Sequence, residues 1–96
     1  MKITMIKTDS SNIFSIGFDP KKKILAVRFR DRQNADKGGD TYLYFDVPTD
    51  VWVAFKNSES VGEFFHAKIR NGGYKYQKLP LKKGDVAYIE NISKKK

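Results

Sequence analysis

The chain lacks cysteine altogether and contains one histidine, one tryptophan and three prolines among its 96 residues. Without cysteine there is no disulfide, no thiolate nucleophile and no thiolate-bound metal, and one histidine leaves no histidine pair for a metal ion. No uninterrupted apolar run approaches the roughly 20 residues of a membrane-spanning helix. Residues 1–7 are too short and too polar for the apolar centre of a signal peptide. We therefore expect a soluble, cytoplasmic protein with no metal, no cofactor and no membrane contact.

What the chain does contain is apolar surface and positive charge. Hydrophobic residues make up 40% and aromatic residues 14%, which is enough for a folded core, and 96 residues correspond to one domain over 1–96. Nineteen Lys and Arg oppose eleven Asp and Glu, and the net charge is +4 over residues 1–40, −3 over 41–66 and +7 over 67–96. A basic surface of this kind favours an anionic partner, which nucleic acid and acidic proteins both satisfy.

Alternation of apolar and polar residues predicts strands in the first half of the chain. Residues 1–5 and 14–18 alternate with period two on either side of a polar segment, so they form two strands or one strand interrupted by a turn or bulge. Asp19-Pro20 is typical of a turn, after which residues 23–30 alternate again and place Leu25, Val27 and Phe29 in the core.

The segment 41–47 is the next predicted strand, after a long polar loop over 31–40. We assign Leu43, Phe45 and Val47 to the core, which turns Tyr42 and Tyr44 outward. If this strand pairs with 23–30, the outward face combines the tyrosines with Arg28 and Arg30, because neighbours on one face of adjacent strands contact each other. An open alternative is that a helix, the N-terminal strand or the C-terminal segment covers both tyrosines.

Two short helices and late strands follow. Thr49-Asp50 offers an N-cap for a helix over 51–56. Ser60-x-x-Glu63 has the form of a capping box, apolar residues at 61, 64, 65 and 69 have helical spacing, and Asn71-Gly72-Gly73 is a typical helix stop. Segments 74–76 and 86–89 read as strands around a turn at 82–85. The fold class is α+β: a small antiparallel sheet (β-meander) followed by two short helices and one or two C-terminal strands.

The order of these parts is similar to that of a known family. Tyr-x-Tyr at 42–44, Val-Pro at 47–48, Ser-x-Gly-x-x-Phe at 60–65 and Ile-Arg at 69–70 resemble the KTSC domain, which occurs at the C-terminus of some lysyl-tRNA synthetases and as a stand-alone bacterial or phage protein. The resemblance covers residues 10–76 and leaves 80–96 as a basic C-terminal extension. It implies a role in RNA binding.

Aromatic rings beside guanidinium groups are also what an RNA-binding surface requires, because rings stack on unpaired bases and guanidinium groups contact phosphate. The candidate nucleic-acid-binding residues are Arg28, Arg30, Tyr42, Tyr44, Lys68 and Arg70. Arg70 could equally stabilise the last carbonyls of its helix, and Trp52 is by default a core residue.

No motif in the sequence places a catalytic group. Ser60 and His66 are about two turns apart on one predicted helix, which is not a nucleophile–base arrangement, and no phosphate-binding glycine loop occurs. We therefore expect a non-enzymatic RNA-binding module with no small-molecule substrate. The alternative is a phage or mobile-element accessory protein that binds and modulates a host protein complex through the same surface.

Overall fold

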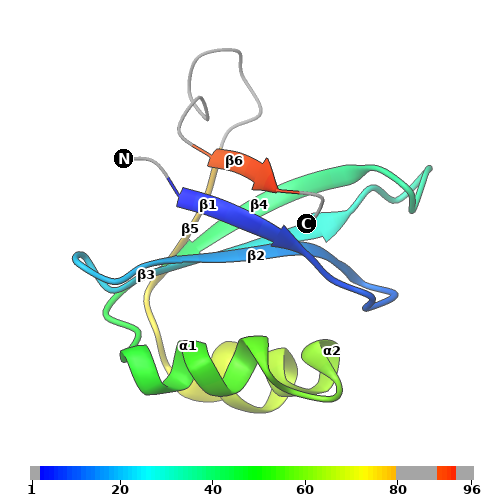
Figure 1. The fold of residues 1–96 in the computed structure, drawn as a ribbon. Coiled ribbons are helices and arrows are strands. Elements are labelled where there is room, and N and C mark those ends of the chain that lie inside the picture. The colour runs from blue at the N-terminus through cyan, green and yellow to red at the C-terminus, as the bar shows by residue number, and fades with distance from the viewer. Residues whose placement is uncertain (1–2, 80–88, 93–96) are drawn as a thin grey trace.

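The expected α+β fold is confirmed by the computed structural model, which describes residues 3–79 and 89–92 (Figure 1). One six-stranded sheet has the order β5-β4-β3-β2-β1-β6, and every neighbouring pair is antiparallel except β1 with β6. The strands are β1 (Ile3–Lys7), β2 (Ile13–Asp19), β3 (Ile24–Arg30), β4 (Gly38–Tyr44), β5 (Tyr76–Lys78) and β6 (Ile89–Ile92).

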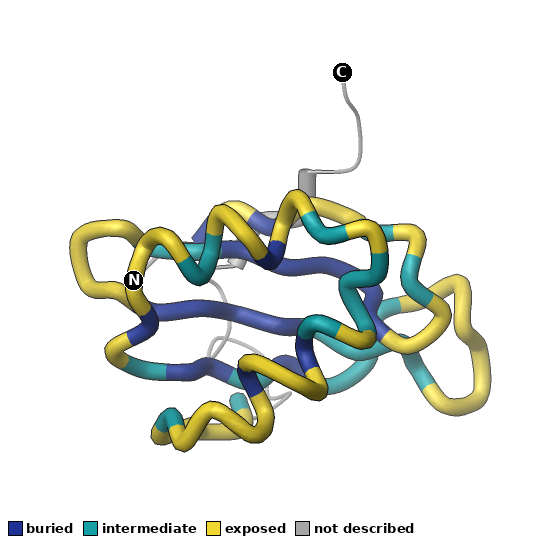
Figure 2. The backbone as a smooth tube through the Cα atoms, turned by 90° about the horizontal axis from the view of Figure 1, so that it is seen from below, coloured by how far each residue is buried: buried dark blue, intermediate teal, exposed yellow. Residues whose placement is uncertain are grey.

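The helices lie together on one side of the sheet, and the edge of the sheet formed by β1 and β6 lies away from them (Figure 1). After α1 (Thr49–Lys56) the chain forms α2 (Val61–Phe64), a π-helical turn (Phe65–Ile69) and a 3₁₀ turn (Arg70–Gly72), and it stops at Gly73 with a left-handed φ of 81°. The outer surface of these helices is largely exposed, whereas the strands behind them are buried (Figure 2). None of the helices in the described residues is long and apolar enough to cross a membrane.

The two helix starts differ from one another. Ser60 caps α2 as predicted, because its hydroxyl accepts a hydrogen bond from the Glu63 amide at 3.3 Å. The reciprocal half of the capping box is replaced, because the Ser60 amide donates to the Ser58 hydroxyl at 3.1 Å. The predicted cap of α1 is wrong, because Thr49 is already helical and the N-cap is Pro48, which has no side-chain acceptor. The Pro48 carbonyl instead accepts hydrogen bonds from the amides of Val51 and Trp52.

Both faces of the central strands are buried, so the molecule has two cores. The cluster under the helices consists of Ile13, Ile16, Leu25, Val27, Tyr44, Val47, Phe55, Phe65 and Ile69. The cluster on the opposite face consists of Ile3, Met5, Ile24, Ala26 and Leu43. Trp52 is half-buried and its ring stacks on Phe18 at 5.6 Å between centroids, which agrees with a packing role.

The predicted outward orientation of Tyr42 and Tyr44 is wrong. Leu25 pairs with Tyr44 and Val27 with Tyr42, so the tyrosines share the face that packs under the helices. Tyr44 is only 6% exposed, and the covering by a helix that the sequence left open is the arrangement found. Arg28 pairs with Thr41 and therefore lies on the opposite face of the sheet from the tyrosines.

Several predicted boundaries also shift. β4 begins at Gly38, inside the expected 31–40 loop, and it ends at Tyr44 because Asp46 has a positive φ of 58° that no strand accommodates. The strand expected over 74–76 is β5 at 76–78, and the one expected over 86–89 is β6 at 89–92. The predictions for residues 82–85, 86–88 and 94–96 lie outside the described residues. The Asp19 turn is confirmed, since its carboxylate accepts hydrogen bonds from the amides of Lys21 and Lys22.

Gly17 on β2 pairs with Met5 on β1 and has no room for a side chain. A Cβ added there would meet the Thr4 carbonyl oxygen and would lie 2.8 Å from both the Ile3 Cγ2 and the Met5 Sδ atoms. We therefore expect Gly17→Ala to displace β1 and to lower the free energy of unfolding by about 1–3 kcal/mol. Urea unfolding measures this loss, and exposed Ser11→Ala, which should change the same quantity by less than about 0.5 kcal/mol, is the control. An unchanged midpoint for Gly17→Ala would contradict the packing described.

Candidate nucleic-acid interface

An open groove of about 1030 Å³ runs between the strands and the helical segment. One wall is the end of β3 with the loop that follows it, the floor is β4 and β5, and the other wall is the segment 62–71. Because of its tyrosines we call this the aromatic groove. Of the predicted site residues, Arg28, Arg30, Tyr42, Tyr44 and Arg70 contribute to its lining, although Arg28 lies on the opposite face of the sheet from the tyrosines and its guanidinium lies near the Phe14 ring. Lys68 is exposed and does not line it.

The helical wall owes its shape to the π-helical turn. Such turns are uncommon, and they often occur at functional sites because they re-aim side chains. Within this turn Phe65 and Ile69 are buried against the sheet, whereas His66 is exposed and lines the aromatic groove. Arg70 follows at the start of the 3₁₀ turn, exposed and on the same groove.

The floor of the aromatic groove is a group of three tyrosine rings. Tyr76 on β5 pairs with Tyr44 on β4, and its ring lies 5.7 Å from Tyr44 and 6.1 Å from Tyr42 between centroids. Beneath them Phe65 packs edge-on to Tyr44 at 5.8 Å. Tyr76 is 64% exposed, while Tyr44 is 6% exposed, so Tyr76 is the ring that meets solvent.

Tyr44 is held in its neutral form. Burial raises the pKa of Tyr44 from 10.0 to about 12, the neighbouring phenols of Tyr42 and Tyr76 act in the same direction, and Arg70 lowers it. Arg70 lines the aromatic groove together with the three tyrosines. The neutral, tightly packed Tyr44 is therefore a structural support for the groove rather than a group that titrates during function.

The Arg30 side chain joins two loops through three hydrogen bonds. Its Nε donates to the Ser10 carbonyl at 2.7 Å, Nη2 donates to the Thr8 carbonyl at 3.0 Å and Nη1 donates to the Ala35 carbonyl at 2.8 Å. All three nitrogens therefore bond backbone oxygens, and the side chain ties the loop before β2 to the loop before β4. The guanidinium has little capacity left for a phosphate group.

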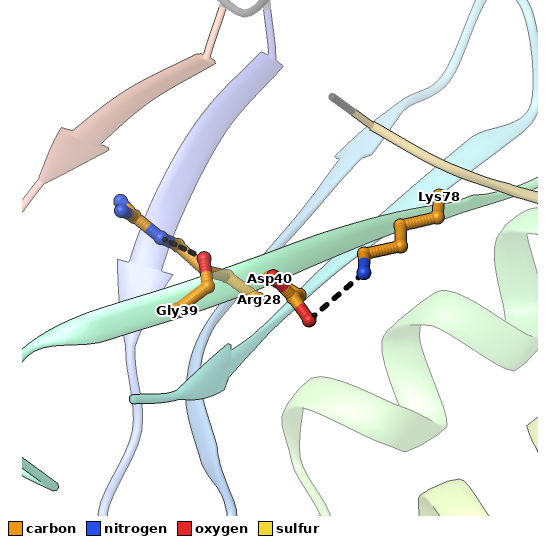
Figure 3. Close-up of polar contacts among 4 residues, drawn as sticks. All are labelled: Arg28, Gly39, Asp40 and Lys78. Atoms are coloured by element: carbon orange, nitrogen blue, oxygen red, sulfur yellow. Dashed lines mark hydrogen bonds and ion pairs between the residues drawn. The ribbon is translucent and has the colours of Figure 1, made fainter. Parts of the chain in front are cut away.

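Arg28 is also bound to backbone, though more weakly. Its Nε donates to the Gly39 carbonyl at 3.2 Å, as Figure 3 shows, and Nη2 lies 3.5 Å from the Gly38 carbonyl. The guanidinium carbons of Arg28 and Arg30 lie 5.8 Å and 5.6 Å from the centre of the Phe14 ring, and the Lys7 ammonium lies 5.1 Å from it. These three cations cover the ring of Phe14, which lies where the pairing of β2 with β3 shifts its register, and they stabilise this irregularity.

The guanidinium groups that remain open are those of Arg32 and Arg70. Both are exposed and line the aromatic groove from opposite walls, and within the described part of the chain neither makes a hydrogen bond or ion pair. The two carboxylates on the groove are already engaged. Asp31 accepts hydrogen bonds from the amides of Gln33 and Asn34, and Asp40 forms an ion pair with Lys78 at 3.3 Å (Figure 3).

A second groove, of about 870 Å³, lies on the other side of Gly62 and His66, which line both grooves. Its charged lining residues are Lys7, Asp9, Lys56, Glu59 and Glu63, so acidic groups outnumber basic ones. Four arginines face two aspartates along the aromatic groove. The aromatic groove is therefore the one whose charge suits an anion. Among the described side chains, no three of His, Cys, Asp or Glu gather as metal ligands would.

Sequence reasoning missed two residues of this groove, Tyr76 and Arg32. Tyr76 was placed on a late strand, but the sequence does not show which earlier strand it pairs with. Arg32 is in the segment 31–40, which the sequence predicts as a loop, and no motif or periodicity there marks it as a site residue. The predicted shared face of Arg28 and the tyrosines is wrong, because their register puts them on opposite faces of the sheet. The sequence also does not show the backbone partners of Arg30, which lie up to 22 residues away in sequence.

Comparison with known proteins gives consistent matches. The family model of the KTSC domain matches residues 9–76. A protein of Tsukamurella paurometabola is 38% identical over 66 residues, covering 69% of this chain and 88% of the relative. A lysine–tRNA ligase of Nostoc sp. is 31% identical over 75 residues, which is 78% of this chain and 12% of the ligase. The crystal structure of a KTSC domain protein from Yersinia pestis is similar with a TM-score of 0.69 and 32% identity, covering 81% of this chain and 99% of that one.

The different roles of Arg30 and Arg70 predict different effects on stability. Arg30→Gln leaves three carbonyls without their charged donor, so the free energy of unfolding should fall by about 1–3 kcal/mol. Arg70→Gln should change it by less than about 0.5 kcal/mol. Urea unfolding of both variants measures the contrast, and equal stability of the two would show that the Arg30 bonds contribute nothing.

The raised pKa of Tyr44 predicts a loss of stability at alkaline pH. Since the folded state favours the neutral phenol, its contribution is intact below pH 10 and is lost as the pH rises through about 12. Over this range the wild type should lose up to about 1.4 kcal/mol more per pH unit than Tyr44→Phe. Urea unfolding at a series of pH values measures the two slopes. Parallel slopes would mean that the Tyr44 phenol titrates alike in the folded and unfolded states.

Proposed function

Because this chain belongs to the KTSC domain family, we propose that it is a small, non-enzymatic module that binds RNA in the aromatic groove. Members of the family are small domains, and one relative of this chain is part of a protein named lysine–tRNA ligase. An RNA-binding role would be carried out in the cytoplasm. The observation that carries the proposal is the meeting of exposed aromatic surface with two open guanidinium groups in one groove.

The chemistry of the groove suits RNA in two respects. Its floor exposes the aromatic side chain of Tyr76, and aromatic side chains are the usual stacking partners of unpaired bases. Arg32 and Arg70 stand on opposite walls and can donate to phosphate oxygens from both sides. The engaged arginines, Arg28 and Arg30, contribute positive potential without having to leave their backbone partners.

The charge of the whole chain adds to this local arrangement. A net charge of +8 raises the local concentration of a polyanion and speeds its encounter with the protein. The groove then supplies the directed contacts. Binding of this kind depends on the release of counterions and weakens steeply as salt rises.

The proposal predicts a charge-reversal effect that is confined to the groove. Arg32→Glu with Arg70→Glu should weaken binding of labelled single-stranded RNA at least tenfold and should reduce the salt slope by about 0.7 per lost phosphate contact. Lys21→Glu with Lys22→Glu makes the same change in net charge at an exposed turn away from the groove and is the matched control. Fluorescence anisotropy across a salt series measures both pairs.

The outcomes of this experiment distinguish binding in the aromatic groove from a general effect of net charge and from the absence of RNA binding. Equal loss in the two double variants would mean that only net charge matters and that the groove is not the site. If the wild type binds no RNA at low salt, the RNA function is wrong, and docking on a host protein complex becomes the function to test. Thermal unfolding of every variant shows whether a loss of binding is a loss of fold.

A further inference from the structure

Tyr76 has the properties of a stacking platform within the aromatic groove. The residue is 64% exposed, the largest exposed fraction among the large hydrophobic residues that the structure describes as exposed. An exposed aromatic ring of this size leaves apolar area in contact with water, and a flat partner that covers it gains the corresponding burial energy.

The platform is supported by neighbouring rings and at its backbone. The rings of Tyr42 and Tyr44 lie beside it on the same face of the sheet, at 6.1 Å and 5.7 Å between centroids. β5 is fixed to β4 by pairing of Tyr76 with Tyr44 and by flanking hydrogen bonds, from the Phe45 amide to the Lys75 carbonyl at 2.9 Å and from the Leu79 amide to the Thr41 carbonyl at 2.8 Å. A ring held in this way loses little conformational entropy when a ligand stacks on it.

The open guanidinium groups are placed for the charged part of the same ligand. Arg70 lines the aromatic groove together with the three tyrosines, and Arg32 lines the facing wall. A ligand that satisfies both features has a flat ring joined to phosphate groups, which describes a nucleotide. The volume of about 1030 Å³ is at the upper end of the range for single small-molecule sites, so it suits a short stretch of chain better than a free mononucleotide.

A duplex cannot use this arrangement. Its bases are stacked on one another and paired, so none offers a free face to Tyr76, whereas bases in single strands and loops can be splayed out onto aromatic side chains. We propose that the aromatic groove recognises unpaired RNA, with one base stacked on the ring of Tyr76 and the adjoining phosphates held between Arg32 and Arg70. This inference rests on the proposed RNA-binding function and names the form of RNA.

The experiment uses a short single-stranded oligoadenylate in which one adenine is replaced by a fluorescent analogue whose emission is quenched by stacking. Binding is followed by anisotropy and stacking by the quench. Tyr76→Leu, which removes the ring and keeps an apolar side chain over Tyr42 and Tyr44, should weaken binding on the order of tenfold and abolish the quench. Tyr76→Phe keeps the ring and should retain both signals. An RNA duplex of the same length should bind more weakly than the single strand. Its affinity should be the same for the wild type, Tyr76→Leu and Tyr76→Phe.

Two results would overturn the inference and leave RNA binding in place: a duplex bound as tightly as the single strand, or Tyr76→Leu binding and quenching like the wild type. Absence of any RNA binding at low salt would overturn the proposed function as well. Single-stranded DNA serves as a further probe, and DNA bound as tightly as RNA would keep the stacking site while removing its restriction to RNA. Unchanged thermal unfolding of Tyr76→Leu and Tyr76→Phe ensures that each result reports on the site.

Discussion

The register between β3 and β4 is the constraint on which the rest of the structure depends. Pairing of Leu25 with Tyr44 and of Val27 with Tyr42 directs both tyrosines toward the helices. A shift by one residue would exchange the two faces of β4 and bring Leu43 under the helices. The register thus determines at once which residues form the helix-side core, what supports Tyr76, and on which face of the sheet Arg28 lies.

The same register explains which parts of the fold could be predicted from the sequence. The strands, the Asp19 turn, the Ser60 cap and the Gly73 stop each depend on a local pattern, and each is found. The orientation of Tyr42 and Tyr44 depends instead on which face of β4 is covered. Alternation of apolar and polar residues identifies the buried face of a strand only when its other face is exposed to water. In this sheet both faces carry a buried cluster, so alternation could not show which face of β4 packs under the helices.

The candidate site could be predicted in part for a related reason. The sequence shows which residues are positively charged or aromatic, but it does not show which of them already bond other parts of the chain. The guanidinium of Arg30 is used by carbonyls of Thr8 and Ser10, far away in sequence, and no residue pattern encodes such bonds. In the same way, the exposure of Tyr76 follows from where β5 joins the sheet edge, which depends on the length and path of the helical segment before it.

The arginines of the aromatic groove fall into two groups. Arg28 and Arg30 are bound to backbone carbonyls and stabilise the fold, whereas Arg32 and Arg70 are the ones proposed to bind phosphate. A guanidinium that bonds three carbonyls would have to give up those bonds to hold a phosphate, and the loss of three hydrogen bonds from a charged donor opposes that exchange. Arg32 and Arg70 carry no such cost, because within the described residues they have no bonds to give up. Charges beyond about 10 Å act through screened potential and influence encounter more than affinity. The proposed recognition of RNA therefore depends on the few groups that the fold leaves free, Tyr76 and two guanidinium groups, rather than on net charge.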